Sequence, residues 1–526
     1  PTPAGKVGKD QVRVKPGVYE GNVPMTPAET DPLANGRYGG TLLNRYLDPP
    51  SMDFNRTLSC TINVTMDYTK NKLVRGVFGP RANPALINVE PDLAENWEVS
   101  PDQTVFTFHL RKGVKFHNVA PVNGREFTSA DVRASIERYR AGGVQKDVWE
   151  PVSNIETPDN YTVKVTLSQP LADFPRNIAA WSHMDAKEVL DNPDLLKDKA
   201  IGTGPFIQSE WTRKERSVFT KHPDYFEKGL PKLDKATMVI MKEPSAAVAA
   251  MLSGQIDGMS DVPLQFVSQL KAQKNLTVYG EIEGNYVYYG MNCKRAPFDD
   301  INLRRAVAYA INREVIIKQA FFGHALQAYT PISPPMTDFY DPNIATSGRG
   351  QRFDLAKAKE YRAKVAQKGT IQPIFMASEQ GLYGTRMVQS VLPMLEAIDI
   401  KPKVELIERA AWVQRLNARD FDMYDYNWWA DLDPDETITP EFRTGEAWNY
   451  PGWSNARFDE LVTAAQDTLD VSKRQAFYKE AADIIMDEAP IGIVAHMPVF
   501  KCLSQKVQGF KYIPVDSLNL HTVSLA

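Results

Sequence analysis

The chain has 526 residues, too many for one hydrophobic core, and its 43% apolar and 24% charged residues are typical of a globular protein with two or three domains. Its 61 basic and 65 acidic residues nearly balance. The basic residues form no tract of the kind that binds phosphates, so no nucleic-acid partner is expected. No apolar run approaches about 18 residues, and the sequence therefore predicts no membrane-spanning helix.

Neither the N-terminal segment nor the three cysteines indicate a particular chemistry. The chain starts at Pro1 without a methionine or an apolar signal segment, which we interpret as a processed or engineered start. Residues 1–35 are rich in Pro, Gly, Lys and Thr and are predicted to form an extended arm. Cys60, Cys293 and Cys502 lie far apart and show no zinc-ligand spacing, so three buried thiols are favoured over one disulfide with a free thiol.

The first predicted elements are strands. Gly39-Gly40-Thr-Leu-Leu opens the first strand, and Asp48-Pro49-Pro50 ends it. Residues 104–110 alternate polar and apolar side chains, and Lys112-Gly113 provides a turn before residues 114–116, so a hairpin is predicted there.

Strands and helices alternate from this point on. One helix is predicted to start with Thr128 or Ser129 as N-cap and Asp131 in its first turn, and to run through Tyr139. Further strands are predicted at 161–167, 217–221, 236–241 and 286–292, and further helices at 245–253, 303–322, 385–397, 458–467 and 473–488. This alternation defines an α/β protein. Residues 499–526 are too few for a domain and are expected to pack onto an earlier one.

One stretch stands out, Tyr424-Asp-Tyr-Asn-Trp-Trp-Ala-Asp-Leu-Asp-Pro-Asp-Glu436. It holds two tryptophans, two tyrosines and five acidic residues, and no basic residue. Pro434 argues against a helix or central strand through it, so we interpret the stretch as a functional loop. A solvated acidic turn is the alternative. The pair Trp428-Trp429 favours function, because two exposed indoles would leave much apolar area in water unless a ligand or a second lobe covers them.

Four motifs occur in an order typical of one family. They are 94–116, in which an acidic turn and an alternating strand lead to Arg-Lys-Gly-Val-Lys-Phe116; Gly202-Thr-Gly-Pro-Phe206; 297–314, with its Asn-Leu-Arg-Arg-Ala-Val-Ala-Tyr-Ala-Ile core; and 428–435, followed by Asn455-Ala-Arg-Phe-Asp459. From residue 39 to its end the chain resembles the family 5 extracellular solute-binding proteins, the peptide- and nickel-type receptors of ABC importers. The motifs themselves are structural: the apolar stripe of 303–311 is core, and Gly202-Thr-Gly-Pro lacks the lysine of a phosphate loop.

The resemblance implies an α/β, two-lobed, periplasmic-binding-protein-like fold (type II, cluster C) with an extra subdomain in the first lobe. The expected parts are lobe 1 at 36–280 plus 500–526, its inserted subdomain at 51–199, and lobe 2 at 281–499. Two chain crossings, near 279–284 and 494–500, are expected to form the hinge on which the lobes close.

The resemblance also implies a function, the capture of a peptide or peptide-like amphoteric solute between the lobes and its delivery to a membrane ABC permease. In peptide-binding members the acidic residue after Trp-x-Ala/Gly pairs with the ligand ammonium, and this position is Asp431 here. Asp425 stands where oligopeptide receptors can carry an arginine, which favours a cationic or amphoteric ligand. The loop is one residue shorter than the common Asp-x-x-Asp-Pro form, so the register of Asp433 stays open.

Further candidate binding residues come from three places. Trp428, Trp429 and Ala430 precede Asp431 in the loop, Asn44, Arg45 and Tyr46 precede the Leu47-Asp48-Pro49 turn where the first lobe of the family reaches the cleft, and Trp448 and Tyr450 belong to a second aromatic patch with Asn449 and Trp453. Each could instead be structural. Arg409 and Arg386 are weaker candidates for positive charge, because surface arginines are common.

Other chemistries fit less well. Asp431, Asp433 and Asp435 have calcium-loop spacing, but Glu436 replaces the required glycine and Phe442 the final glutamate. Hydrolase, zinc and phosphate-loop motifs are absent, so no catalytic residue, metal or cofactor is predicted. An oligosaccharide, an opine-like conjugate or a metal chelate is the alternative solute, and a hydrolase using residues 431–436 the alternative class. A monomer in the periplasm or on the cell surface is expected, with lipid anchoring left open.

Overall fold

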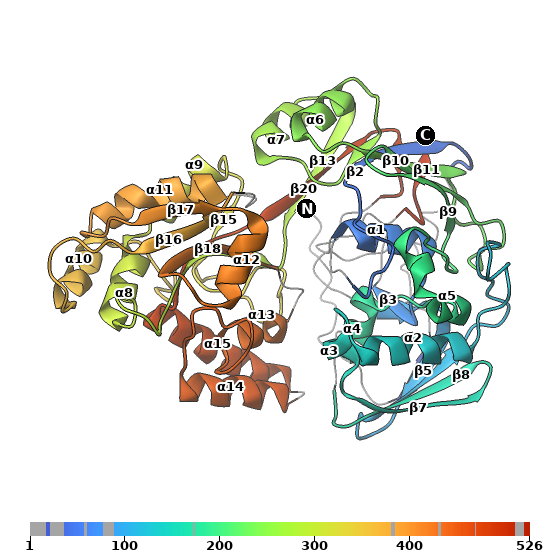
Figure 1. Cartoon of the computed structure of the whole chain (residues 1–526), viewed down its shortest axis with the longest axis horizontal. Helices are drawn as coiled ribbons and strands as arrows, with labels where there is room; N and C mark the ends of the chain where they lie inside the picture. The colour runs from blue at the N-terminus through green and yellow to red at the C-terminus, as the bar shows by residue number, and fades with distance from the viewer. Residues whose placement is uncertain are drawn as a thin grey trace. The chain divides into compact units, whose positions relative to one another are not determined.

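The computed structural model describes residues 17–20, 36–56, 60–76, 89–171, 174–379, 384–429, 433–468, 470–510 and 520–526. The chain divides into two compact units, Pro1–Tyr279 with Phe500–Ala526, and Gly280–Val499 (Figure 1). It passes from one unit to the other within two strands, β13 (Leu276–Ile282) and β20 (Pro498–Ser504). No helix in the described part of the chain is long and apolar enough to cross a membrane.

The first unit contains a seven-stranded sheet with the order β13-β20-β12-β2-β11-β10-β9. The strands not yet given are β2 (Thr41–Tyr46), β9 (Phe206–Thr212), β10 (Arg216–Lys221), β11 (Lys235–Ile240) and β12 (Gly258–Met259). β2 lies in the middle and runs parallel to both β11 and β12, which are joined by α6 (Pro244–Leu252). The carboxyl ends of these three strands therefore share one edge of the sheet.

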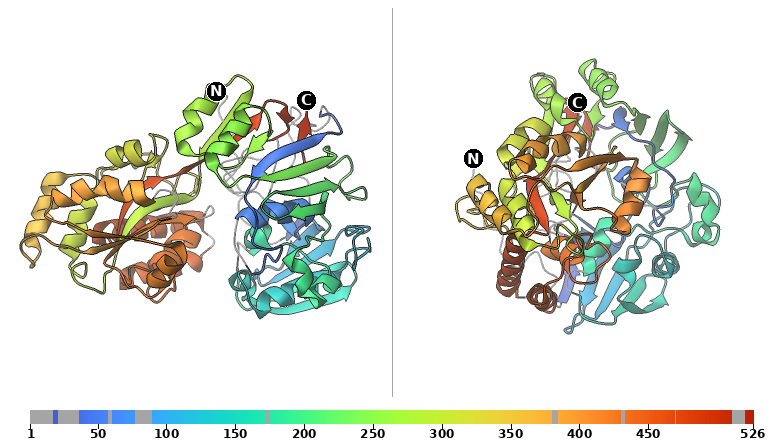
Figure 2. Two further views of the ribbon diagram at one scale, coloured as in Figure 1. Left: turned by 45° about the horizontal axis from the view of Figure 1, so that its top comes forward. Right: turned by 60° about the vertical axis from the view of Figure 1, so that its left-hand side comes forward.

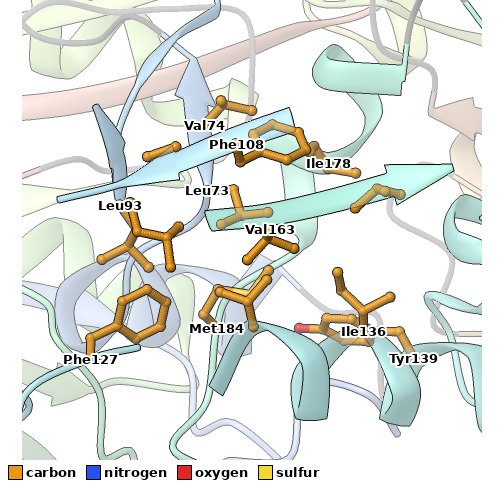
Figure 3. Close-up of a cluster of buried hydrophobic side chains, with 14 of the residues drawn as sticks. Leu73, Val74, Leu93, Phe108, Phe127, Ile136, Tyr139, Val163, Ile178 and Met184 are labelled. Carbon is orange, nitrogen blue, oxygen red and sulfur yellow. The ribbon is translucent and has the colours of Figure 1, made fainter. Parts of the chain in front are cut away.

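A second, antiparallel sheet of the first unit has the order β1-β5-β6-β8-β7. Its strands are β1 (Gly17–Glu20), β5 (Ala94–Val99), β6 (Val105–Leu110), β7 (Val152–Asp159) and β8 (Thr162–Leu167), and its helices are α2 (Ser129–Ala141), α3 (Lys146–Trp149), α4 (Phe174–Trp181) and α5 (Lys187–Asp191). β1, from the segment expected to be an extended arm, pairs with β5. Alternate side chains such as Phe108 and Val163 meet Ile136 of α2 in the buried core (Figure 3).

The remaining elements of the first unit are short. They are α1 (Cys60–Thr69), β3 (Val74–Gly76), β4 (Val89–Pro91), the 3₁₀ turns η4 (Pro193–Lys197) and η5 (Leu264–Phe266), α7 (Val267–Lys271), β21 (Val507–Gln508) and β22 (Ser524–Leu525). Among the described cysteine side chains, those of Cys293 and Cys502 are free thiols.

The second unit is built on a six-stranded sheet with the order β15-β19-β14-β18-β16-β17. Its strands are β14 (Asn285–Met291), β15 (Leu326–Gln327), β16 (Ile374–Ser378), β17 (Lys403–Ile407), β18 (Met423–Trp429) and β19 (Ile491–His496). Its helices are α8 (Ile301–Ala310), α9 (Arg313–Ala320), α10 (Leu355–Lys364), α11 (Gly384–Glu396), α12 (Arg409–Asn417), α13 (Pro434–Phe442), α14 (Ala456–Gln466) and α15 (Val471–Glu488).

Helices cover both faces of this sheet (Figure 2). α12 to α15 close one face over a core that includes Trp412, Phe442 and Tyr478. α8, α9 and α11 lie against the other face. Alternate residues of β14 and β18 therefore enter two different layers.

Several local predictions are confirmed. α2 starts where expected: Thr128 is the N-cap, and its backbone N–H donates to the Asp131 carboxylate over 3.0 Å. The predicted helices near 458–467 and 473–488 correspond to α14 and α15, each begun by a side-chain cap, Asn455 and Asp470. These starts are local in origin, which is why the sequence reveals them.

Three local predictions are wrong. The helix expected over 303–322 breaks at Ile311, whose extended backbone ends α8, and Asn312 then caps α9 by accepting from the Val315 N–H. The hairpin expected between 104–110 and 114–116 does not form, because β6 pairs with β5 and β8 instead. Residues 424–429, expected in a loop, form β18, a central strand between β14 and β16.

Gly290 tests the fit between β14 and β18. It lies opposite Tyr424 in the ladder, and a Cβ atom there would come within 2.1 Å of the buried Tyr424 ring. We expect Gly290→Ala to lower the free energy of unfolding by about 1–3 kcal/mol, more than the about 0.5–1 kcal/mol that alanine gains in backbone entropy. Urea unfolding of both proteins measures the difference. A variant as stable as the wild type would contradict this fit.

Candidate ligand-binding site

The site is best approached from the edge where parallel strands of the second unit end. β16 runs parallel to both β17 and β18, so Ser378, Ile407 and Trp429 end at one edge. α11 follows β16 and α12 follows β17. The two helices lie on opposite faces, because α11 receives the Tyr289 hydroxyl at the Met387 carbonyl whereas Trp412 of α12 stacks on Tyr426. Such a crevice between diverging connections is where open α/β sheets bind ligands.

An aromatic cluster fills the α12 side of β14 and β18. Trp412 stacks on Tyr426 with ring centroids 5.8 Å apart, and Trp428 meets Trp448 edge to face at 5.0 Å. Trp428 is only 3% exposed, whereas Trp448 is 51% exposed and forms the outer layer of the cluster. Within the described residues, the indole nitrogens of Trp412 and Trp428 have no hydrogen-bond partner. The cluster thus presents one large apolar side chain to its surroundings and holds the others beneath it.

A buried glutamate lies under this cluster. Glu441, near the end of α13, accepts the hydroxyls of Tyr286 and Tyr288, which both come from β14. Burial raises the pKa of the Glu441 carboxyl to about 8, and the two tyrosine hydrogen bonds only partly oppose this. Glu441 is therefore largely protonated at neutral pH and fastens α13 to β14.

The other face of β18 holds a second buried acid. Asp425 lies opposite Tyr289 in the ladder, and its Oδ1 atom has no hydrogen-bond partner among the described residues. Burial raises the pKa of Asp425 to about 7, against the opposing effects of backbone N–H groups and Arg409. The hydroxyl of Ser378, at the end of β16, is also buried and has no partner in the described part of the chain. This polar niche borders the carboxyl edge of the parallel strands.

The acidic run after β18 is divided among different partners. Asp433 is the N-cap of α13 and forms a two-pronged ion pair with Arg474 of α15, at 2.8 and 2.9 Å. Asp435 accepts hydrogen bonds from Thr439 and Tyr478. The Asp433 carboxylate therefore faces inward, toward α15.

The candidate binding residues of the second unit lie in different environments. Trp428 and Tyr450 lie mainly in the core, and Trp448 is exposed beside them. Trp429 is the last residue of β18, but its side chain, together with Ala430 and Asp431, lies outside the described residues. The structure therefore brings together the aromatic candidates and leaves the predicted anchor without a described geometry.

The predicted residues of the first unit end β2. The Arg45 side chain is buried, donates from Nε to the Met241 carbonyl over 3.2 Å and comes within 3.8 Å of Asp261. Asn44 donates to the Arg45 carbonyl, and no described residue donates to its Oδ1 atom. Tyr46 is also mostly buried. These three residues lie at the carboxyl edge shared by β2, β11 and β12.

Two features escaped the sequence analysis. Trp211 donates from Nε1 to the Asp48 carboxylate over 2.9 Å and carries Arg213 at 4.0 Å over its ring, which fixes the turn after β2. Glu441 lies five residues beyond the acidic segment and gave no signal of its own, although the period-two spacing of Tyr286 and Tyr288 could have pointed to a shared partner. Arg409 and Arg386 lie over Trp412 and Phe322 respectively.

The titratable groups of the described residues form no cluster of three or more that could hold a metal ion. His109 pairs with Glu98, and the His117 Nε2 lies 3.1 Å from the Gly204 carbonyl. Burial lowers the pKa of His117 to about 3, so its ring is neutral and structural.

The chain is similar to several known proteins. The family model described as bacterial extracellular solute-binding proteins, family 5 Middle, matches residues 88–450. Di/tripeptide-binding protein 2 of Pseudomonas aeruginosa is 29% identical over 477 residues, 84% of this chain and 87% of that protein. Heme-binding protein A of Haemophilus influenzae is 25% identical over 502 residues, 88% of this chain and 90% of that protein.

Among solved structures, the ABC transporter-associated periplasmic binding protein DppA from Helicobacter pylori, in complex with the peptide STSA, is similar with a TM-score of 0.78 and 27% identity over 93% of this chain and 98% of that one. These matches define a solute-binding protein. The chain belongs to family 5 of the bacterial extracellular solute-binding proteins. The expected fold class, α/β and two-lobed, is confirmed with it.

The buried Glu441 makes the stability of the second unit depend on pH. Its carboxyl has a pKa of about 8 when folded, against an ordinary value of 4.5, so its contribution is complete below 4.5 and is lost as pH rises through 8. Between pH 6.5 and 8 we expect the free energy of opening β14 and β18 to fall by about 1.5 kcal/mol. Hydrogen exchange of these strands measures it, and Glu441→Gln should remove most of the slope. An equal slope in the variant would contradict the assignment.

Proposed function

We propose that this protein is the substrate-binding component of an ABC importer, which captures a peptide or peptide-like amphoteric solute between two lobes and delivers it to a membrane permease. Membership of the solute-binding family carries the proposal. A relative named for di- and tripeptides and a similar structure holding the peptide STSA favour a peptide as the solute. The protein would act as a receptor and not as an enzyme.

We assign the ligand ammonium to Asp431. Its neighbours in the acidic run support this choice by elimination, because Asp433 is paired with Arg474 and Asp435 accepts hydrogen bonds from Thr439 and Tyr478. A carboxylate that closes over a ligand needs a cationic partner. Asp425, whose Oδ1 atom has no partner among the described residues, would make the same region favour cationic or amphoteric solutes over anionic ones.

The aromatic cluster supplies the apolar wall. Trp448 is the exposed member, and Trp428 and Tyr450 support it from beneath, so stacking on the ligand would fall to Trp448 and to Trp429. Ala430 would leave room beside the anchor. Aromatic contacts of this kind bind apolar side chains and sugar faces alike.

The first lobe, proposed at 36–280 plus 500–526 with the inserted subdomain 51–199, would contribute Asn44, Arg45 and Tyr46 on closing over lobe 2 (281–499). These residues end a central parallel strand, and Asn44 keeps an unpaired buried oxygen there. Hinge closure about the two strands that link the units fits the discontinuous chain. Within residues 1–35, expected to form an extended arm, β1 pairs with β5 and so belongs to the sheet of the first unit.

Other solutes are tested as alternatives. A relative named for heme shows that the family carries different cargoes, so an oligosaccharide, an opine-like conjugate and a metal chelate belong in the same screen. We place the protein in the periplasm or at the cell surface, as a monomer without cofactor. Turnover of a bound solute would instead favour a hydrolase using residues 431–436.

The first test is the charge of Asp431. We expect Asp431→Asn to weaken the binding of an amine-bearing di- or tripeptide about ten- to a hundredfold, because a hydrogen bond to a charged group is lost. Refolded protein is first screened by thermal shift, where a ligand at a hundred times its Kd adds about 2.7 kcal/mol of stability. Isothermal calorimetry then gives both affinities.

Glu446→Gln removes a carboxylate from the neighbouring loop and is the matched control, which should bind as the wild type does. Unchanged affinity in Asp431→Asn would disprove the anchor. If only neutral sugars bind, the ligand is an oligosaccharide and not a peptide, and the tryptophans provide most of the binding energy.

The wall is tested by Trp448→Ala. We expect affinity to fall about three- to tenfold, the value of one aromatic contact, and the melting temperature to stay within a degree or so because the side chain is half exposed. Trp453→Ala is the contrast: its buried indole donates to Glu488, so this variant should lose stability. Equal affinity in Trp448→Ala and wild type would remove Trp448 from the site.

A further inference from the structure

A cavity of about 220 Å³ lies in the second unit between α8, α15 and the loop that precedes α10. Gln351 lines this cavity and donates to the Ile491 carbonyl at the start of β19 over 2.7 Å. Ile491 lies opposite Gly290 in β14, whereas Trp429, the last residue of β18, lies opposite Asn285. The cavity and the proposed peptide site therefore adjoin opposite ends of the sheet.

Four charged side chains of the cavity wall form two ion pairs. Arg305 of α8 donates to the Asp487 carboxylate over 2.5 Å. Arg349 pairs with Asp483 at 2.8 Å and also with Asp341 at 3.1 Å. These contacts attach α8 and the loop to α15, so the cavity has a defined wall.

Arg352 also lines the cavity, but no carboxylate among the described residues pairs with it. It donates from Nη1 to the Ala345 carbonyl over 2.9 Å, and from Nη2 to the carbonyls of Ile344 and Arg349 over 2.5 and 3.0 Å. Its guanidinium lies 4.5 Å over the Tyr329 ring. Carbonyl groups satisfy N–H donors but carry no net charge, so the positive charge of Arg352 stays uncompensated.

A second arginine without a counter-ion lies behind the wall. Arg313 is only 1% exposed and donates to the Ile311 carbonyl over 3.1 Å and to Gln351 Oε1 over 3.2 Å. Within the described residues it has no acidic partner, and its Nε atom has no hydrogen-bond partner. Burial lowers the pKa of Arg313 to about 9; Tyr329 opposes this effect and the charge of Arg352 adds to it. An anion in the adjacent cavity would stabilise both guanidinium groups.

The rim of the cavity adds aromatic and basic side chains from α10. Tyr309, which lines the cavity, stacks on Tyr361 with ring centroids 5.7 Å apart. Lys357 donates to the Tyr309 hydroxyl over 2.6 Å, and Asp354, the N-cap of α10, partly offsets the lysine charge. The cationic groups at and around the cavity outnumber the carboxylates by one: Arg305, Arg313, Arg349, Arg352 and Lys357 against Asp341, Asp354, Asp483 and Asp487.

We propose that this cavity is a binding site for a phosphate group, held by the guanidinium groups of Arg352, Arg349 and Arg305. Guanidinium N–H groups match phosphate oxygens in geometry and charge. A phosphate offers more acceptor oxygens than a carboxylate, which suits three arginines that line one cavity. The volume equals that of about seven water molecules, enough for a phosphate that carries a small group such as glycerol. The source is a soluble phosphate compound or the headgroup of an anionic phospholipid.

Calorimetry with inorganic phosphate and with glycerol 1-phosphate tests the site, at an ionic strength held constant with sodium chloride. We expect both compounds to bind the wild type, and to bind Arg352→Gln about tenfold more weakly because charge-assisted hydrogen bonds are lost. Arg352→Lys, which keeps the charge without the planar fork, should recover part of the affinity. The matched control is Arg457→Gln, which breaks the ion pair of another arginine with α15, that with Glu480, and should bind phosphate as the wild type does.

Asp483→Asn distinguishes a binding site from a structural cluster. The change removes a carboxylate from the wall and frees Arg349 from that partner, so we expect phosphate affinity to rise about three- to tenfold. Damage to the fold would lower the affinity and could not raise it. Should Arg352→Gln fail to fold by circular dichroism, Asp483→Asn carries the test.

Vesicles distinguish the two sources of the phosphate group. Cosedimentation with phosphatidylglycerol vesicles but not with phosphatidylcholine vesicles, lost in Arg352→Gln, would identify a lipid headgroup. Binding of the soluble compounds without cosedimentation would identify a free phosphate compound. The site would be overturned if neither phosphate nor glycerol 1-phosphate binds at constant ionic strength, or if wild type, Arg352→Gln and Asp483→Asn bind them equally.

Discussion

The structure of the second unit depends on the pairing of β14 with β18. This ladder places Gly290 under the Tyr424 ring and aligns Tyr286 and Tyr288 so that both reach one carboxyl group on α13. Backbone hydrogen bonds alone would not distinguish this register from a neighbouring one, but a one-residue slip would send every aromatic side chain to the wrong layer. The side chains therefore specify the register of β14 and β18, and this register fixes where β18 ends, at Trp429.

The carboxyl groups between residues 425 and 436 have different electrostatic environments and therefore different roles. Five acids lie between residues 425 and 436, and an unpaired cluster of that kind would repel itself and destabilise the fold. Burial raises the pKa of Asp425 to about 7, Arg474 neutralises Asp433, and Asp435 accepts hydrogen bonds from Thr439 and Tyr478. The acidic run of the sequence is thus a set of carboxyl groups with different partners. Because several of these carboxyl groups are paired or buried, negative charge can be concentrated on those that would face a ligand.

The sequence predicts features that arise from neighbours in the chain and fails where distant contacts decide. The Thr128 cap and the starts of α14 and α15 follow from side chains one to three residues away. The break at Ile311 and the strand over 423–429 do not, because the strand is stabilised by partners in β14 and β16 that its own poor alternation does not reveal. The same holds for the site: Trp428 and Tyr450, both candidate binding residues from the sequence, lie mainly in the core, while the sequence does not reveal that Arg474, 41 residues from Asp433, is its partner.

This difference between local and distant contacts explains why the sequence reveals the family but not the ligand. Two of the motifs that point to the family are packing motifs: Leu303 and Val307 of α8 are buried, and Gly204 is required because a Cβ atom would come within 2.4 Å of the backbone at Thr69. Such close contacts tolerate few substitutions. Side chains on surface connections between rigid elements can be exchanged at little cost in stability. A fold held by packing of this kind can therefore accept a different ligand through changes at such connections.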